Sequence, residues 1–268
     1  MMAATLAQGT TILQNCAQEP EVVDVSALLC KMGALIEGAG SPNITIQGVF
    51  RLHGGISHTI IPDRIEAGTY MMAALATKGN LTLHNVKKSH LTSVIQVLEK
   101  CGGQISTVVA SDGSSLQIGA KKRLKSVQYL ETGTYPQFPT DLQAPFCTLM
   151  SIARGKSVIK ETIFENRFIH LPELEKMGAK VSIIEENTVA ITGRQFLQGG
   201  FVQAHDLRGA AALVIAGLAA KDSITVISGA THHLNRGYSD FVHKLRSCSA
   251  RIVEEAGKCK QNILKSHI

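Results

Sequence analysis

The sequence predicts an α/β fold in which one unit of helices and strands is repeated along the chain. Three observations carry this prediction. A helix that ends in a small-residue stop recurs roughly every 70 residues. Strand pairs with a short turn follow these stops, and strongly apolar helices alternate with the amphipathic ones. We therefore expect units of β-α-β-β-α order, or a cyclic permutation of that order.

The stops resemble one another in sequence. They read KMGA, KCGG, KMGA and SCSA at residues 31–34, 100–103, 176–179 and 247–250. The helix before each stop is amphipathic, with apolar residues at three- and four-residue steps, as at Leu91, Val94, Ile95 and Leu98. Glycine at the stop allows the left-handed cap that ends a helix. After each of the first three stops we expect a strand pair, for example 180–184 with 188–192.

A second class of helix is apolar nearly all round. These helices begin near residues 62–64, 139–141 and 205–208 and run to Gly79, Gly155 and Asp222. Such helices are buried on most faces, so the sequence predicts a domain wrapped around central helices. A short strand should follow each of them, at 80–84, 157–160 and 223–227.

The N-terminus departs from this period. Residues 1–9 match only the last turns of a buried helix, so the first unit is expected to begin in mid-element. No Ser/Gly-rich linker interrupts the chain, and a boundary near residues 60–62 divides it into segments 1–60 and 61–268.

Composition narrows the class of protein. Hydrophobic residues make up 44% and charged residues 18%, and no apolar stretch approaches the roughly 20 residues of a membrane span. The first residues carry no secretory signal, which indicates a cytoplasmic chain. The six cysteines lack CxxC spacing, so we expect reduced thiols, mostly in the core, and no zinc site.

The net charge of +6 is not accompanied by the aromatic content of a nucleic-acid groove, because aromatic residues make up only 4%. A solvated basic surface or a cleft for anionic substrates is the better interpretation, and no nucleic-acid partner is expected. The basic cluster at residues 121–125 is predicted to be an exposed loop.

Candidate functional residues occur at matching positions of the units. The apolar helices begin at Asp63, Asp141 and Asp206, and each aspartate taken alone would be interpreted as a helix cap. If these helix ends converge, their N–H groups and neighbouring arginines such as Arg208 would form an anion site. Arg167 and Arg236 lie in loops at matching positions one unit apart, although either could form an ordinary surface ion pair.

Four motifs occur in order over nearly the whole chain. They are PDRIEAGT at 62–69, FPTDLQA at 138–144, FENRF at 164–168 and NRGY at 235–238. Together they resemble the signatures of the UDP-N-acetylglucosamine enolpyruvyl transferases, within the enolpyruvyl transferase family. The resemblance implies two inside-out α/β barrel domains of three βαβαββ-type units each. On that basis the chain corresponds to the C-terminal two-thirds, with 1–60 ending one lobe and 61–268 forming the other, and the N-terminal part missing.

The resemblance also implies a reaction. The family transfers the enolpyruvyl group of phosphoenolpyruvate to the 3-hydroxyl of UDP-N-acetylglucosamine and releases phosphate, the first committed step of peptidoglycan precursor synthesis. Asp141 would be the general base, and Ile163 would contact the nucleotide sugar through its backbone. Arg167, Arg208 and Arg236 would hold the carboxylate and phosphate of phosphoenolpyruvate. No metal and no other cofactor is expected.

Departures from the family pattern leave alternatives open. The Lys-Asn pair and the acid cysteine of the family have no counterpart here, and Asn235 stands where an acidic residue often occurs. The chain alone is therefore expected to be inactive, and a second chain supplying the remaining part is one partner to consider. Alternatives are a non-catalytic remnant that binds nucleotide sugar and, less favoured because of the FENRF motif, the sister enzyme enolpyruvylshikimate-phosphate synthase.

Overall fold

The computed structural model describes residues 1–110, 113–221, 224–255 and 263–267. The chain forms two compact units, one made of Met1–Pro62 with Thr134–Gln137 and the other of Asp63–Gly133 with Phe138–Ile268. No helix in the described ranges is long and apolar enough to cross a membrane.

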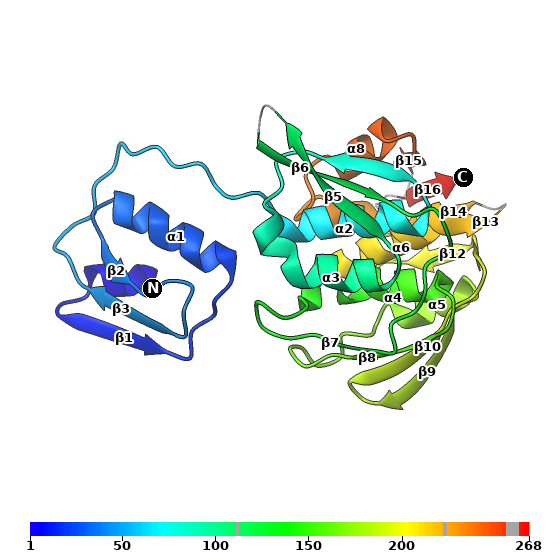
Figure 1. Cartoon of the computed structure of the whole chain (residues 1–268), viewed down its shortest axis with the longest axis horizontal. Helices are drawn as coiled ribbons and strands as arrows, with labels where there is room; N and C mark the ends of the chain where they lie inside the picture. The colour runs from blue at the N-terminus through cyan, green and yellow to red at the C-terminus, as the bar shows by residue number, and fades with distance from the viewer. Residues whose placement is uncertain (111–112, 222–223, 256–262, 268) are drawn as a thin grey trace. The chain divides into compact units, whose positions relative to one another are not determined.

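The first unit is a three-stranded antiparallel sheet with one long helix. Its elements are η1 (Met2–Leu6), β1 (Thr10–Gln14), α1 (Pro20–Lys31), β2 (Leu35–Glu37) and β3 (Asn43–Gln47). Strand β3 lies between β1 and β2, and α1 lies across one face of this sheet (Figure 1). Leu29 of α1 and the alternate residues Ile44 and Ile46 of β3 are buried, as period-two alternation requires.

The N-terminal segment differs from the expected end of a buried helix. Residues Met2–Leu6 form a 3-10 helix in which Thr5 is buried, but the side chains of Met2 and Leu6 are 68% and 56% exposed. Within the first unit as described, no element covers these two apolar side chains, which is why the predicted burial fails.

The second unit contains the remaining elements. Its helices are α2 (Arg64–Ala76), η2 (Lys88–Leu91), α3 (Thr92–Lys100), η3 (Thr140–Leu142), α4 (Gln143–Ile152), α5 (Leu171–Lys176), α6 (Leu207–Ala219), α7 (Ala230–Leu234) and α8 (Phe241–Ser247). Its strands are β4 (Asn80–Leu83), β5 (Gln104–Ala110), β6 (Gly113–Gly119), β7 (Tyr129–Glu131), β8 (Lys156–Lys160), β9 (Lys180–Glu185), β10 (Thr188–Thr192), β11 (Leu197–Gln198), β12 (Phe201–Gln203), β13 (Ala220–Lys221), β14 (Thr225–Ser228), β15 (Arg251–Glu255) and β16 (Ile263–His267).

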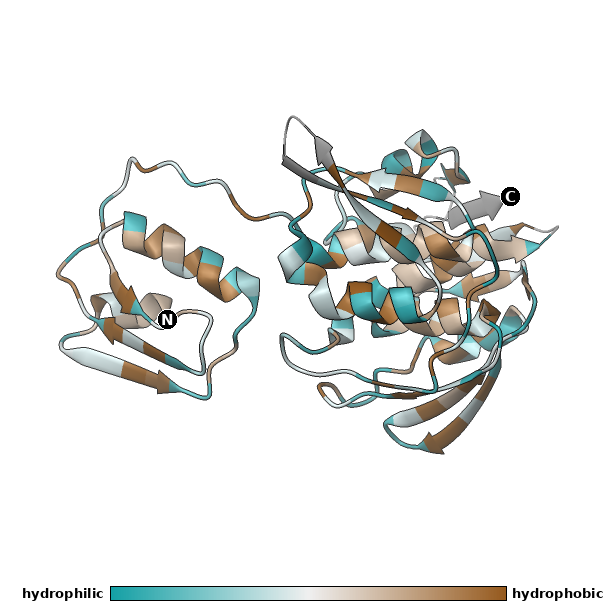
Figure 2. Cartoon of the chain, viewed as in Figure 1, coloured by the Kyte–Doolittle hydropathy of each residue, from teal (hydrophilic) through white to brown (hydrophobic). Residues whose placement is uncertain are grey.

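The helices α2, α4 and α6 form the interior of this unit. They pack against one another, and nearly every residue of each is buried, as their all-round apolar sequences predict. Hydrophobic colours predominate along α6, whereas α3 alternates between hydrophobic and hydrophilic residues (Figure 2). The prediction of central apolar helices is thus confirmed.

Sheets surround these helices (Figure 1). In the described part of the chain the larger ones have the orders β4-β6-β5, β7-β8-β10-β9 and β12-β14-β16-β15. The predicted pair at 180–184 and 188–192 is the antiparallel hairpin β9–β10. The fourth stop is also followed by a strand pair, β15 with β16, which the sequence did not predict. The strand predicted at 223–227 is β14, although Ser223 lies outside the described residues.

The basic cluster at residues 121–125 lies outside the helices and strands, and its lysines are exposed, as predicted, but Arg123 is half-buried. It donates hydrogen bonds to the carbonyls of Ile152, Ala153 and Arg194. It therefore satisfies carbonyls at the C-terminal end of α4, where a cation is favourable.

The cysteine thiols are less buried than expected. Of the described cysteines, Cys101 and Cys147 are buried, and the others are half-buried or exposed; Cys259 lies outside the described residues.

Candidate active site

The three aspartates at the helix starts have different roles. Asp63 caps α2 by accepting hydrogen bonds from the backbone N–H groups of Ile65 and Glu66. Asp206 caps α6 in the same way, through the N–H groups of Arg208 and Gly209. Both are N-caps, as the simpler interpretation predicted.

Asp141 makes no such cap and instead holds two arginines. It lies in the 3-10 turn η3 ahead of α4, and its side chain is 38% exposed. Its Oδ1 atom accepts a hydrogen bond from Arg167 Nη2 at 3.1 Å and another from Arg208 Nε at 3.1 Å. Asp141 Oδ2 has no hydrogen-bond donor among the described residues, so one carboxylate oxygen remains open to a ligand.

A tyrosine joins this group to α2. Arg208 Nη1 donates to the Tyr238 hydroxyl oxygen at 3.2 Å, and this oxygen is 3.0 Å from Thr69 Oγ1 in α2. The Thr69 hydroxyl donates to the Ile65 carbonyl, so Tyr238 donates to Thr69. Together with the Asp141 contact, these bonds show that the N-terminal ends of α2, α4 and α6 converge.

The charge states in this group follow from burial and neighbours. Burial acts to lower the pKa of Arg208, but Tyr238 and Asp141 outweigh it, and the net shift is upward. Burial raises the pKa of the Tyr238 hydroxyl despite the nearby Arg208. Arg208 therefore remains a cation and Tyr238 remains protonated, which leaves Arg208 able to bind an anion.

The loop after β8 positions Arg167. Asn166 adopts a left-handed conformation, with φ of 52°, which asparagine tolerates better than most residues. The Arg167 guanidinium carbon lies 4.9 Å from the centre of the Phe164 ring, a cation–π distance. Asn166 thus allows the turn, and Phe164 packs against the arginine that the turn presents.

Ile163 begins the same loop, and its two backbone groups differ. Its N–H donates to the Glu161 carboxylate at 2.9 Å, and so is already used. Its carbonyl oxygen accepts no hydrogen bond from the described residues, and its side chain is partly exposed. Any backbone contact from Ile163 to a ligand would therefore be made through the carbonyl.

Arg236 is not part of the ion-pair group. It is exposed in the turn after α7, and among the described residues it forms no ion pair or hydrogen bond. It lines a polar surface recess of about 700 Å³ together with Tyr238. Gly237 allows this turn to approach α6, because a Cβ at that position would overlap the Leu207 side chain. The structure thus brings Asp141, Arg167 and Arg208 into contact. Arg236 lies outside this group, two residues before Tyr238, which bonds to Arg208.

Sequence reasoning missed several polar residues of this region. Tyr238 and Thr69 lie inside two of the quoted motifs, but neither was selected as a candidate site residue. His170 was also missed; it is buried beside Gly209, and its Nε2 atom has no hydrogen-bond partner in the described chain. Burial lowers the pKa of His170 to about 4, so its imidazole is neutral near pH 7.

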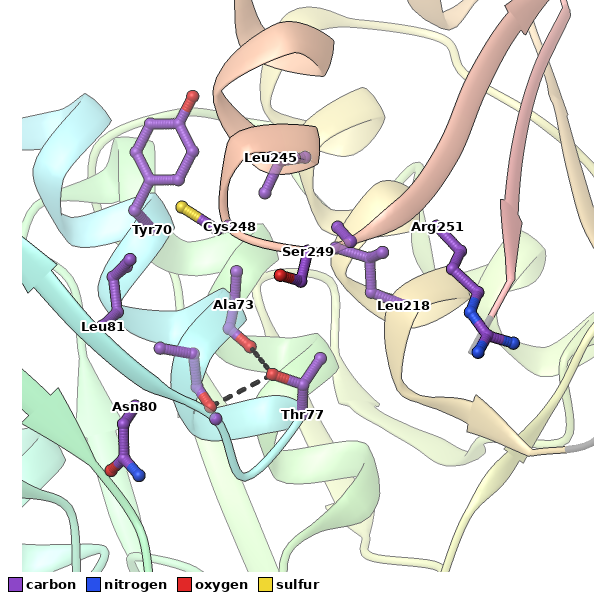
Figure 3. A pocket seen from close by; sticks show the side chains of 13 residues that line it. Tyr70, Ala73, Thr77, Asn80, Leu81, Leu218, Leu245, Cys248, Ser249 and Arg251 are labelled. Atoms are coloured by element: carbon purple, nitrogen blue, oxygen red, sulfur yellow. Dashed lines mark hydrogen bonds between the residues drawn. The ribbon is translucent and has the colours of Figure 1, made fainter.

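A separate cavity of about 300 Å³ contains none of the predicted site residues. It lies between α2, α6, α8 and β15 (Figure 3). The Thr77 hydroxyl on its wall already donates to the carbonyls of Ala73 and Ala74, and the Tyr70 hydroxyl points away from Thr77. This cavity offers little convergent polar chemistry, so the helix starts are the better candidate site.

Comparison with known proteins agrees with this fold. Helices inside and strands outside are the arrangement expected of the enolpyruvyl transferase class. A family model described as EPSP synthase (3-phosphoshikimate 1-carboxyvinyltransferase) matches residues 1–245, and the chain belongs to this family.

Named relatives refine the likeness. The chain is 44% identical over 252 residues to a UDP-N-acetylglucosamine 1-carboxyvinyltransferase of Finegoldia magna, covering 94% of this chain and 58% of the relative. It is 47% identical over 252 residues to UDP-N-acetylglucosamine 1-carboxyvinyltransferase 2 of Prochlorococcus marinus, covering 94% of this chain and 57% of that relative. The chain therefore spans less than two thirds of the length of these relatives.

Solved structures show the same fold. The enolpyruvyl transferase NikO from Streptomyces tendae matches with a TM-score of 0.80 and 26% identity, over 99% of this chain and 59% of that one. EPSP synthase from Acinetobacter baumannii matches with a TM-score of 0.62 and 21% identity, over 82% of this chain and 52% of that one. The predicted family and fold are confirmed.

Proposed function

We propose that this chain carries one side of the active site of a UDP-N-acetylglucosamine 1-carboxyvinyltransferase. The reaction would move the enolpyruvyl group of phosphoenolpyruvate to the sugar 3-hydroxyl and release phosphate, as the first committed step of peptidoglycan precursor synthesis. The observation that supports this most is the shared contact of Arg167 and Arg208 with Asp141 Oδ1. Segment 1–60 would then end one lobe, and 61–268 would form the three units of the other.

Each residue has a role that its surroundings support. Asp141 Oδ2 would accept the proton of the sugar hydroxyl as its oxygen bonds to C2 of phosphoenolpyruvate. Arg167 and Arg208 would bind the carboxylate and phosphate, and Arg236 would join them from its exposed turn when substrate binds. Ile163 would contact the nucleotide sugar through its carbonyl.

The reaction needs an acid that this set of residues does not supply. Addition places a proton on C3 of phosphoenolpyruvate, and elimination removes a proton from C3 as phosphate leaves. The acid for that step is expected from the part of the relatives that this chain does not match. We infer that residues 1–268 as a separate polypeptide bind substrate but turn over far more slowly than a full-length relative, because orienting contacts from the unmatched part of the relatives would be absent from that polypeptide.

We place the protein in the cytosol. The described cysteines are free thiols, which suits a reducing compartment. Small-molecule substrates are the proposed ligands, and a second chain that supplies the remaining catalytic groups is the proposed partner.

Calorimetry with UDP-N-acetylglucosamine tests the assignment. Wild-type chain should bind this nucleotide sugar, and Asp141→Asn should weaken binding about tenfold because the carboxylate acceptor is lost. Glu185→Gln, the same chemical change on the exposed outer strand β9, should bind like wild type. Shikimate 3-phosphate is the probe for the sister enzyme, and binding of it in preference to the nucleotide sugar would overturn the assignment.

A phosphate-release assay tests the expected inactivity. Purified chain with both substrates should release phosphate at no more than a trace rate. A non-catalytic remnant remains the second candidate, because the chain spans only 58% of a relative such as that of Finegoldia magna. Activity gained by adding the unmatched part of a full-length relative as a separate polypeptide would favour the transferase, whereas sugar binding without such activity would favour the remnant.

A further inference from the structure

A buried carboxylate lies behind the candidate site. Glu161 follows β8 directly and is only 1% exposed. Its Oε1 atom accepts hydrogen bonds from the N–H groups of Ile163 at 2.9 Å and Phe164 at 3.2 Å, and its Oε2 atom accepts one from Thr140 Oγ1 at 2.9 Å. No lysine or arginine in the described chain pairs with it. Burying a carboxylate is costly unless its oxygens are hydrogen-bonded, so these three donors fix where Glu161 lies.

The three donors belong to two different parts of the site. Thr140 immediately precedes Asp141, whereas Ile163 and Phe164 begin the loop that carries Arg167. Arg167 closes the connection from the other side, because its guanidinium bonds to Asp141 and lies over the Phe164 ring. The contacts form a closed ring that runs from Glu161 through Thr140 and Asp141 to Arg167, then through Phe164 back to Glu161.

We propose that Glu161 is a positioning residue that sets the separation between Asp141 and the loop at Ile163–Phe164. Glu161 is too buried to touch substrate itself and acts through its hydrogen-bond partners. Hydrogen bonds to an ionised carboxylate are roughly twice as strong as neutral ones, so this carboxylate holds both segments before any ligand arrives. This inference rests on the proposed function, because it assigns the Ile163 carbonyl and Asp141 to the same nucleotide sugar.

The Glu161 carboxylate has two arms, Oε1 bonded to the Ile163 and Phe164 N–H groups and Oε2 bonded to Thr140, and they can be tested separately. In Glu161→Gln the side-chain shape is kept, and the amide can keep its oxygen for the two backbone donors by turning its NH2 group to the Thr140 hydroxyl, but the hydrogen bonds lose the strength that a charged acceptor gives them. We expect amide hydrogen exchange at Ile163 or Phe164 to accelerate at least tenfold in the free chain, and binding of UDP-N-acetylglucosamine to weaken about tenfold. Thr140→Val removes only the other arm, so it should weaken binding while both amides stay protected.

Two further variants separate positioning from general stability. Thr140→Ser restores the hydroxyl and should restore wild-type affinity. Glu173→Gln is the control, because Glu173 is also a buried carboxylate that accepts a backbone N–H, that of Gln203; it pairs with Lys176 and bonds to neither Thr140 nor the loop. This control should lose stability in urea and keep wild-type affinity.

The outcomes separate this inference from the proposed function. If wild-type chain does not bind the nucleotide sugar, the proposed function fails, and the exchange rates alone decide whether Glu161 holds the loop. If wild type binds but Glu161→Gln binds equally well, or Thr140→Ser binds as weakly as Thr140→Val, Glu161 has no positioning role. Should Glu161→Gln fail to fold, the Thr140 pair still decides the matter.

Discussion

Arg208 and Tyr238 are in contact twice. The guanidinium donates a hydrogen bond to the phenolic oxygen at 3.2 Å, and its carbon lies 5.5 Å from the ring centre. Because the same hydroxyl reaches Thr69 in α2, one tyrosine fixes the orientation of an anion-binding arginine against a second buried helix.

Tyr238→Phe should weaken both stability and anion binding. The change leaves the Thr69 hydroxyl and an Arg208 N–H without their buried partner, which costs about 1–3 kcal/mol of the free energy of unfolding. Inorganic phosphate should bind several-fold more weakly, because Arg208 becomes free to move. Urea unfolding and phosphate calorimetry would measure the two effects. Tyr70→Phe is the control, since the buried Tyr70 hydroxyl has no hydrogen-bond partner in the described chain and should be dispensable.

Gly68→Ala should separate α2 from the turn that carries Asp141. A Cβ at Gly68 would overlap the side chain of Leu142, which is fully buried and has little room to move. We expect a loss of about 1–3 kcal/mol in the free energy of unfolding, as is typical of an overpacked core. Thermal unfolding would measure it, with Gly200→Ala as control because a Cβ there meets open space. Equal melting temperatures for the two variants would contradict the close approach of α2 and η3.

His170 should make the stability depend on pH. Burial lowers its pKa to about 4 in the folded chain, whereas an unfolded histidine titrates near 6.5. The unfolded state therefore binds the proton first, and the stability that is fully present above pH 6.5 declines as the pH falls toward 4. At about 1.4 kcal/mol per pKa unit, the total loss is about 3 kcal/mol.

Urea titrations between pH 6.5 and 5 would reveal this dependence. His170→Asn keeps a polar side chain of similar size but has no titrating group, so its stability should vary much less with pH. His232→Gln, which removes an exposed imidazole, should retain the wild-type slope. A wild-type slope in the His170 variant would show that another group is responsible.

The cysteines should differ in reactivity by location. Burial raises the pKa of the Cys101 thiol to about 12, and burial together with the nearby Glu161 raises that of Cys147. Thiolates are the reactive species, so iodoacetamide should label the exposed Cys30 and Cys248 in the native chain while Cys101 and Cys147 react only after unfolding. Mass spectrometry of digested samples would show which sites are labelled; rapid native labelling of Cys147 would argue against the packing of α4.

The sequence predicted the order of elements well because hydrophobic period is a local property. The apolar run of α6 and the alternation in the β9–β10 hairpin need no knowledge of distant residues. The same local patterns could not distinguish Asp141 from Asp63, since both precede an apolar helix. Whether an aspartate serves its own helix or a pair of arginines depends on where Arg167 and Arg208 lie in three dimensions.

The residues that sequence reasoning missed share one property. Glu161 bonds to Thr140 in another segment and His170 is buried beside Gly209 of α6, whereas their local sequence patterns resemble an ordinary strand end and helix start. Arg123 was assigned to the surface because it belongs to a basic run, yet its guanidinium bonds to the carbonyl of Ile152 in another segment. Long-range hydrogen bonds leave no periodic trace, so they become visible only in the folded chain.

The position of the strands on the outside has a practical consequence. The turn of the β9–β10 hairpin at Glu186 and Asn187 projects from the outer layer, where Ile183 and Ile184 already face solvent. A fluorescent label attached at the exposed Glu186 position would leave Asn187 in place, whose carbonyl accepts a hydrogen bond from the Glu161 N–H. Such a labelled chain would allow the arrival of a ligand to be followed optically in a protein that has no tryptophan of its own.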